Sequence, residues 1–159
     1  MEGFELAALK SLLAKQPVAA LATLHSGEPA VSMVPFAMLS SGSGFVIHVS
    51  RLATHTRDML RNPAVALLVT ASLEEAHSPL ALPRASIQGN ARQCLPDSPG
   101  YLEARRAYLT KLPDAEELFN FSDFSLFIVE PKSIRYVAGF GRAVSLTPER
   151  MRAVLGAEP

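Results

Sequence analysis

The chain of 159 residues carries 15 basic and 15 acidic side chains, which gives a formal net charge of zero. A chain of this length, 48% hydrophobic and 19% charged, is typical of one globular domain with a sizeable core. Because there is no overall basic field, we do not expect nucleic acid as a partner. The single cysteine, Cys94, excludes an intrachain disulfide and favours a reducing compartment.

The first residues, "MEGFELAALKSLLAKQ", combine early acids with periodic leucines. A signal peptide would instead start with a basic segment followed by an apolar one. Apolar runs elsewhere fall short of the roughly 18 residues that a membrane helix needs. We therefore predict a cytoplasmic protein without a membrane partner.

In the first half of the chain, the leucine stripe predicts a helix over residues 2–15, which Pro17 ends. Residues 18–39 read as a β-hairpin whose turn is "HSGEP" at 25–29. Pro35 indicates a bulge or an exposed edge in its second strand. After a turn at 40–44, "FVIHV" at 45–49 predicts a third strand.

The second half begins with a helix after Ser50, with an expected buried stripe of Leu52, Ala53, Thr56, Met59 and Leu60. Residues 64–71 predict a buried strand, and residues 84–95 alternate as a half-buried strand does. A helix is expected from Ser98, as N-cap, and Pro99 to Pro113. A short helix at 114–121, one or two strands within 124–141 and a short helix starting at Thr147 and Pro148 complete the chain.

This order of elements favours a mainly β protein with flanking helices, in which hairpin-connected strands form an antiparallel barrel. We find no repeat or linker in the sequence. We therefore predict a single domain over residues 1–159, with an N-terminal helix at 1–16 and a short helical tail at 144–159.

The junction between the third strand and the next helix carries a cluster of hydrogen-bond donors. Ser50 is a candidate N-cap, and the free amides and dipole of a helix start attract anions, phosphate in particular. The side chains that follow add further donors: Arg51, Thr54, His55, Thr56 and Arg57. The pattern is consistent with a phosphate cradle, and equally with a capped helix that has a solvated basic face.

Four segments together resemble a known family: "GEPAVSMVPF", "FVIHVSRLATHTRDMLRNPAVALLV", "RASIQGNAR" and "FSDFSLFIVEPKSIRYVAGFGRA". They are similar to the FMN-binding split barrels that resemble pyridoxamine 5'-phosphate oxidase, with a closer likeness to the haem-utilisation (HugZ-type) branch. The resemblance covers residues 18–143. It implies a six-stranded antiparallel split β-barrel and a homodimer with FMN at the subunit interface.

The resemblance also assigns cofactor-binding roles to individual residues. Ser50 matches the hydroxyl residue beside the phosphate, and His55 with Thr56 matches the pair that holds it, with Arg51 and Arg57 able to restore charge. Arg84 would lie near the flavin ring, where a guanidinium stabilises an anionic reduced flavin. One strand segment would run along the ring: Ser32, Met33, Val34 and Pro35.

From this we predict an FMN-binding, flavin-dependent oxidoreductase that acts on an unidentified small molecule. The alternative is a haem-binding or haem-utilisation protein on the same barrel, with His48 or His55 as a possible iron ligand. A deazaflavin cofactor and a cofactor-free dimeric interaction protein are two further alternatives.

The remaining candidate residues favour structural roles. His25 in a turn and His77 in a loop are expected to be solvated, and Cys94 to be a buried inert thiol and not a nucleophile. No metal-binding spacing is present, so no metal site is expected. The segment "AGFGRA" predicts a tight turn, although Arg142 could instead reach towards the cofactor or the partner subunit.

Overall fold

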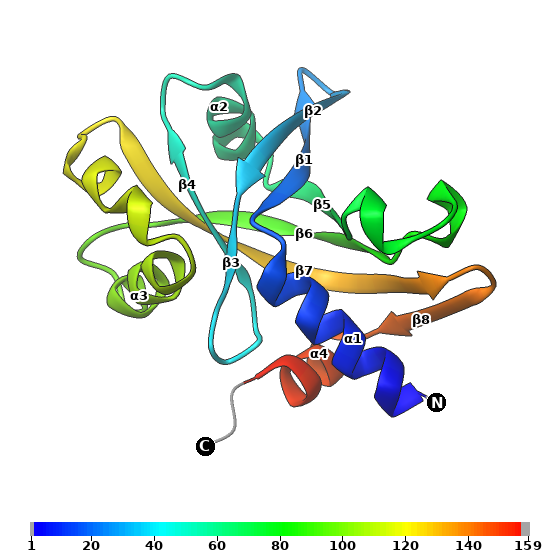
Figure 1. The fold of residues 1–159 in the computed structure, drawn as a ribbon. Helices are drawn as coiled ribbons and strands as arrows, with labels where there is room; N and C mark the ends of the chain where they lie inside the picture. The colour runs from blue at the N-terminus through cyan, green and yellow to red at the C-terminus, as the bar shows by residue number, and fades with distance from the viewer. Residues whose placement is uncertain (1, 157–159) are drawn as a thin grey trace.

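The structure is a computed structural model, and it describes residues 2–156 (Figure 1). Its four α-helices are α1 (Glu2–Lys15), α2 (Thr54–Arg61), α3 (Tyr101–Lys111) and α4 (Pro148–Leu155). Its eight strands are β1 (Val18–His25), β2 (Glu28–Pro35), β3 (Ala37–Met38), β4 (Phe45–Ser50), β5 (Ala64–Thr70), β6 (Arg84–Cys94), β7 (Phe124–Gly139) and β8 (Arg142–Leu146). Three 3₁₀ segments complete it: η1 (Leu73–Glu75), η2 (Pro79–Ala81) and η3 (Pro113–Asn120).

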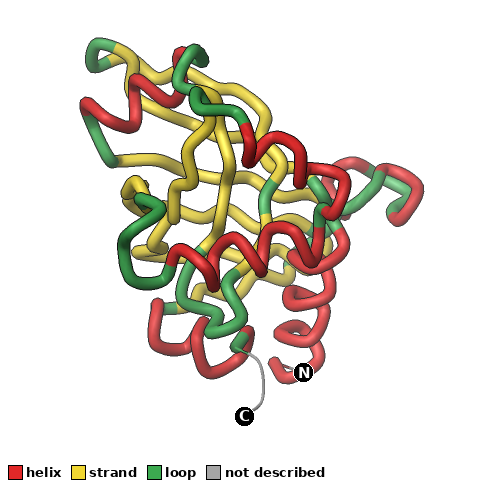
Figure 2. Tube along the Cα trace, turned by 90° about the vertical axis from the view of Figure 1, so that its left-hand side faces the viewer, coloured by secondary structure: helices red, strands yellow, loops and turns green. Residues whose placement is uncertain are grey.

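The strands form one antiparallel sheet in the order β2-β1-β5-β6-β7-β4-β3, with β8 paired to β7. The sheet curls so that β2 also contacts β4, which gives a split barrel, and Figure 2 shows the strands as one curved layer with helices around it. The predicted fold class is therefore confirmed, but the count of six strands is wrong. Two short strands account for the difference: β3 has two residues, and β8 forms a hairpin with β7 at Gly141, where φ is +76°.

The core follows from the two-residue period of the strands. Alternate side chains of β1, β5, β6 and β7 point into the barrel, where Leu21, Leu67, Ile87 and Val129 are buried. Burial of each large aliphatic side chain contributes about 1.5–3 kcal/mol. A second cluster lies between the outer side of the sheet and α3, and it includes Cys94, Leu126 and Tyr108. The prediction that Cys94 is buried is confirmed.

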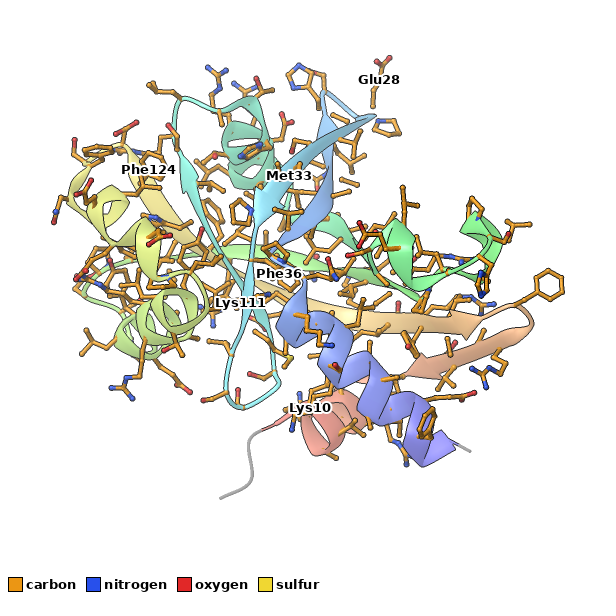
Figure 3. All side chains as sticks on the ribbon, in the orientation of Figure 1. Lys10, Glu28, Met33, Phe36, Lys111 and Phe124 are labelled. Carbon is orange, nitrogen blue, oxygen red and sulfur yellow. The ribbon has the colours of Figure 1, made fainter. Side chains whose placement is uncertain are left out.

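Helix α1 matches its predicted range and is anchored at its C-terminal end. Lys111, the last residue of α3, donates a hydrogen bond from Nζ to the carbonyl of Leu13 at 3.0 Å, and its ammonium lies 3.7 Å from the ring centroid of Phe36 (Figure 3). Carbonyl groups at a helix C-terminus attract cations. Burial lowers the pKa of Lys111 to about 8.

Several predicted boundaries and burial patterns differ from the structure. Helix α3 begins only at Tyr101, because Gly100 has φ +88°, a left-handed conformation that prevents the helix from starting at Ser98 and Pro99. Strand β5 alternates between buried and exposed residues, since one of its faces is uncovered. In α2, Leu52 and Leu60 of the expected stripe are exposed, and Asp58 is buried instead.

The C-terminal segment is only partly helical. Residues 144–146 of the predicted tail belong to β8, whose pairing with β7 overrides a helical conformation. The helix that follows is confirmed, and the Thr147 hydroxyl accepts a hydrogen bond from the Arg150 amide as an N-cap does. Residues 1 and 157–159 of the predicted domain lie outside the described residues. Between residues 2 and 156, no helix is long and apolar enough to span a membrane.

Candidate functional site

The junction between β4 and α2 differs from the predicted helix cap. Helix α2 begins at Thr54, and its N-cap position is Ala53, whose methyl side chain cannot accept a hydrogen bond. The Ser50 hydroxyl instead donates to Oδ2 of Asp123 at 3.1 Å and accepts from the Leu52 amide. The prediction that Ser50 caps the helix is therefore wrong. A three-residue turn separates the strand from the helix, and the Ser50 hydroxyl is hydrogen-bonded to Asp123, the residue before β7.

The other predicted phosphate-binding residues of this junction are placed in different environments. The hydroxyl of buried Thr56 donates to the Ser50 carbonyl at 2.6 Å and so fixes the turn. Arg51 is exposed and donates to the carbonyl of Ser122, while Arg57 is exposed on the helix. His55 is half-buried, and desolvation lowers its pKa. Ligand binding by these residues stays a prediction.

Helix α2 lies beside the β1–β2 hairpin (Figure 1), and a polar network joins the two. Oδ1 of Asp58 lies 2.7 Å from Nδ1 of His25, and Oδ2 accepts a hydrogen bond from the Thr23 hydroxyl at 3.1 Å. Asp58 is only 4% exposed, whereas His25 is 54% exposed. The hydrogen bond from His25 is the main cause that lowers the pKa of Asp58.

The sequence patterns did not indicate this network, because they predict a solvated turn for His25 and leave Asp58 outside the expected buried stripe of the helix. A signal was present, because Thr23 and His25 lie two residues apart and therefore project from the same face of β1. The burial of Asp58 depends on how α2 packs against that strand, which the sequence pattern did not specify.

The predicted ring-facing segment of β2 divides between two faces. Ser32 and Val34 point inwards, and Met33 points outwards and is 63% exposed. The buried hydroxyl of Ser32 has no hydrogen-bond partner within residues 2–156. Ser32 follows Ala30, the partner of Thr23, by two residues, so it is a diagonal neighbour of Thr23 on the inner face. An unpaired hydroxyl therefore lies close to the Asp58 network.

Arg84 lies at the opposite end of the sheet. It pairs across strands with Thr70, whereas α2 precedes Ala64 at the other end of β5, about 20 Å away at 3.3 Å per residue. Its guanidinium donates to the carbonyls of Leu80 and Leu82, and it lines a hollow of about 380 Å³ together with Arg135 and Arg142. Within one chain, Arg84 therefore lies far from the predicted cofactor-binding residues at the β4–α2 junction.

His48 is packed against aromatic rings. It is 7% exposed, it stacks on Phe119 with ring centroids 3.8 Å apart, and it makes edge contact with Tyr108. Its Nδ1 has no hydrogen-bond partner in the described part of the chain. Burial, followed by the charge of Arg105, lowers the pKa of His48 to about 4, so the ring is neutral at pH 7. We define Phe119, Tyr108 and Phe124 around His48 as the aromatic box.

The fold and the sequence define the class of this protein. Residues 6–138 match the model of the pyridoxamine 5'-phosphate oxidase family, and the chain belongs to that family. Within it, the chain is close to the haem-utilisation branch.

Three relatives characterise that branch. The chain is 38% identical over 119 residues to the non-canonical haem oxygenase HOZ of Arabidopsis thaliana. The matched segment covers 75% of this chain and 35% of HOZ. It is 27% identical over 129 residues to the haem oxygenase HutZ of Vibrio cholerae serotype O1, a match that covers 80% of this chain and 72% of HutZ. A solved structure of a haem-binding protein from Mycobacterium smegmatis superposes with a TM-score of 0.84 at 29% identity. The match covers 100% of this chain and 62% of that one. The chain thus spans about a third of the HOZ length.

These comparisons overturn the prediction of a flavin-dependent oxidoreductase. Both curated relatives are named as haem oxygenases, and the structure that covers the whole chain is named as a haem-binding protein. FMN as the cofactor is therefore not supported by these relatives. The flavin prediction depended on a phosphate site at the β4–α2 junction, where Ser50 is bound to Asp123 and the helix starts at Thr54 with Ala53 as its N-cap.

Proposed function

We propose that this protein binds haem and belongs functionally to the haem-handling branch of its family. The observation that carries the proposal is the 38% identity to a haem oxygenase across three quarters of this chain. The haem-binding protein whose fold covers the whole chain supports the same ligand.

The corner formed by α2 and the β1–β2 hairpin has the chemistry that haem requires. Haem is a flat apolar macrocycle with two carboxylates at one edge. Helix α2 and the turn before it expose the apolar Leu52 and Leu60 beside the cations Arg57 and Arg61. Ser32 adds a buried hydroxyl with no partner in residues 2–156. We call this surface the α2 corner, and its residues fit the ligand.

In this proposal the chain's own residues bind and orient the ligand. Arg57 and Arg61 attract the carboxylates, and apolar side chains exclude water from the macrocycle. When bound, haem supplies an iron centre that accepts a protein ligand and reacts with oxygen. Because both curated relatives are named haem oxygenases, oxidative degradation of haem is the second candidate function.

We expect the purified protein to bind added haemin with the appearance of a Soret band. Replacing Arg57 and Arg61 together by serine should weaken binding roughly 2- to 30-fold, since each exposed ion pair contributes about 0.2–1 kcal/mol. Titration of absorbance with haemin measures this difference. The same complex, supplied with ascorbate and air, tests the second candidate by loss of the Soret band and formation of a bile pigment.

The control variant removes two cations elsewhere, Lys10 on α1 and Arg152 on α4, by the same change to serine (Figure 3 labels Lys10). Its affinity for haemin should match that of the unmodified protein. Failure of the unmodified protein to bind haemin would refute the proposed function. Equal affinity of the two double variants would refute the assignment to the α2 corner.

We also propose that the protein is a homodimer that pairs through the outer face of β2, β1 and β5. Two rows of apolar side chains cross these strands in register, Met33–Ala20–Leu68 and Val31–Ala22–Ala66. Val31 and Met33 are 75% and 63% exposed. The rows become polar only at β6, where Ser86 and Gln88 continue them. An exposed apolar face of this kind, bordered by polar residues, is typical of subunit interfaces.

Replacing Val31 and Met33 together by glutamate should convert the dimer to a monomer, because each subunit would bury two unpaired charges in the interface. Light scattering coupled to gel filtration measures the mass. The control is Leu102→Glu, at an equally exposed apolar residue on α3. A monomeric unmodified protein, or a double variant that stays dimeric, would show that this face is not the interface.

The cellular location also belongs to this proposal. We propose the cytoplasm, supported by the single buried thiol of Cys94, which suits a reducing compartment.

A further inference from the structure

We infer that His25 is the protein ligand of the haem iron and that Asp58 is the positioning residue that prepares it. The inference rests on the haem binding proposed above and adds to it the atom that binds the metal. It is carried by the geometry of the His25–Asp58 pair at the edge of the α2 corner.

The pair fixes which ring nitrogen is available. Nδ1 of His25 lies 2.7 Å from Oδ1 of Asp58. A carboxylate only accepts hydrogen bonds, so Nδ1 must carry the proton and the neutral ring then has its lone pair on Nε2. The second carboxylate oxygen is held by Thr23 at 3.1 Å, which prevents Asp58 from turning away. A histidine held through one nitrogen by a carboxylate is the usual arrangement of a metal ligand, because it fixes the ring and raises its basicity.

The burial of the two residues matches these roles. Asp58 is 4% exposed, and its two carboxylate oxygens are held by His25 and Thr23. His25 is 54% exposed, so its ring is open to a ligand from solvent. The interior therefore holds the acceptor rigidly, while the exposed ring presents the metal-binding atom.

The nature of the metal follows from the number of protein ligands. Among residues 2–156, no group of three or more histidine, cysteine, aspartate or glutamate side chains could hold a metal ion. The single imidazole of His25, oriented by Asp58, is therefore poorly suited to a bare Zn²⁺, which takes three or four protein ligands. It does suit haem, whose macrocycle already supplies four nitrogens and which needs one axial side chain.

The other histidines are less suited to this role. His48, one of the two ligands suggested by the sequence, is only 7% exposed and is packed against the rings of the aromatic box, so little of its ring is open to a ligand. His55, the other, is half-buried and has no hydrogen bond to a carboxylate among the described residues that would orient its ring. His77 lies exposed in the loop between η1 and η2.

The test is the spectrum of the haemin complex of four proteins: unmodified, His25→Ala, Asp58→Asn and His77→Ala. Resonance Raman of the ferrous complex should show an iron–histidine stretch in the unmodified protein and in the His77→Ala control. His25→Ala should bind haemin but lose this band, and added imidazole should restore it. Asp58→Asn should keep the band at a lower frequency, because an amide withdraws the Nδ1 proton less than a carboxylate does. A purely structural role of Asp58 would leave the frequency unchanged.

Replacing His25 by methionine provides an independent measurement, because this variant gives the iron a different protein ligand instead of removing the ligand. In His25→Met the iron should acquire the absorption and magnetic circular dichroism of thioether ligation. An unchanged iron–histidine band in His25→Ala, or no thioether signature in His25→Met, would overturn the inference while haem binding stands. If the unmodified protein fails to bind haemin, the proposed function fails instead, and the two failures are therefore distinguishable.

Discussion

Acidification from pH 6.5 to pH 4 is expected to destabilise the protein through His48. The folded protein holds the pKa of His48 at about 4, because burial opposes protonation, whereas an unfolded histidine titrates near its ordinary pKa of 6.5. Between these two values the unfolded state binds more protons, so the free energy of unfolding falls as the pH falls. The loss is complete below about pH 4 and amounts to about 3–4 kcal/mol at about 1.4 kcal/mol per pKa unit.

Urea unfolding at a series of pH values measures this loss, and a His48→Phe variant should remove it. Phenylalanine keeps an aromatic ring against Phe119 and Tyr108 but has no group that titrates. It also eliminates the Nδ1 atom that has no partner in residues 2–156. The control is His77→Phe at an exposed position, which should retain the pH dependence. If His48→Phe loses as much stability on acidification as the unmodified protein, the aromatic box is not its origin.

Substitution of Gly89 by alanine is the second change with a large expected effect. Gly89 lies in β6 where the pairing with β7 shifts register, and a Cβ there would lie 2.4 Å from the carbonyl oxygen of Glu130 and 3.0 Å from Cα of Pro131. These neighbours are backbone atoms of the paired strand, so they cannot turn aside as a flexible side chain would. Forcing extra volume into a packed site costs about 1–3 kcal/mol, and we expect the upper part of that range.

Thermal and urea unfolding of Gly89→Ala measure this cost. The matched control is Gly3→Ala in α1, where an added Cβ meets no atom within 4 Å. That change should be neutral or stabilise the protein by about 0.5–1 kcal/mol, because alanine is favoured over glycine inside a helix. Equal stability of Gly89→Ala and the unmodified protein would show that β7 can move away from β6 at this bulge.

The local elements were largely predictable from the sequence. The range of α1 follows from its leucine stripe and Pro17, and the β1–β2 hairpin follows from its turn residues. The half-buried strand predicted at 84–95 is confirmed as β6, with Ala85, Ile87 and Ala91 on its buried face. These features depend on contacts between residues near each other in the chain or on simple periodicity, both of which a sequence displays directly.

The burial of α2 was less predictable. The sequence pattern indicated an apolar stripe, but the structure buries Asp58 and exposes Leu52 and Leu60. A buried carboxylate is tolerated only when it is hydrogen-bonded, and its partners, Thr23 and His25, come from a strand more than 30 residues earlier. Periodicity within the helix contains no information about these partners.

The sequence by itself determined most of the element order, apart from the short strands β3 and β8, as well as the antiparallel split-barrel class and the family. Only the tertiary structure decided that Ser50 pairs with Asp123, that Arg84 lies at the far end of the sheet, and that His25 is held by Asp58. The physical reason is that periodicity is a local property, whereas a side chain's hydrogen-bond partner depends on which distant strands the fold brings alongside it.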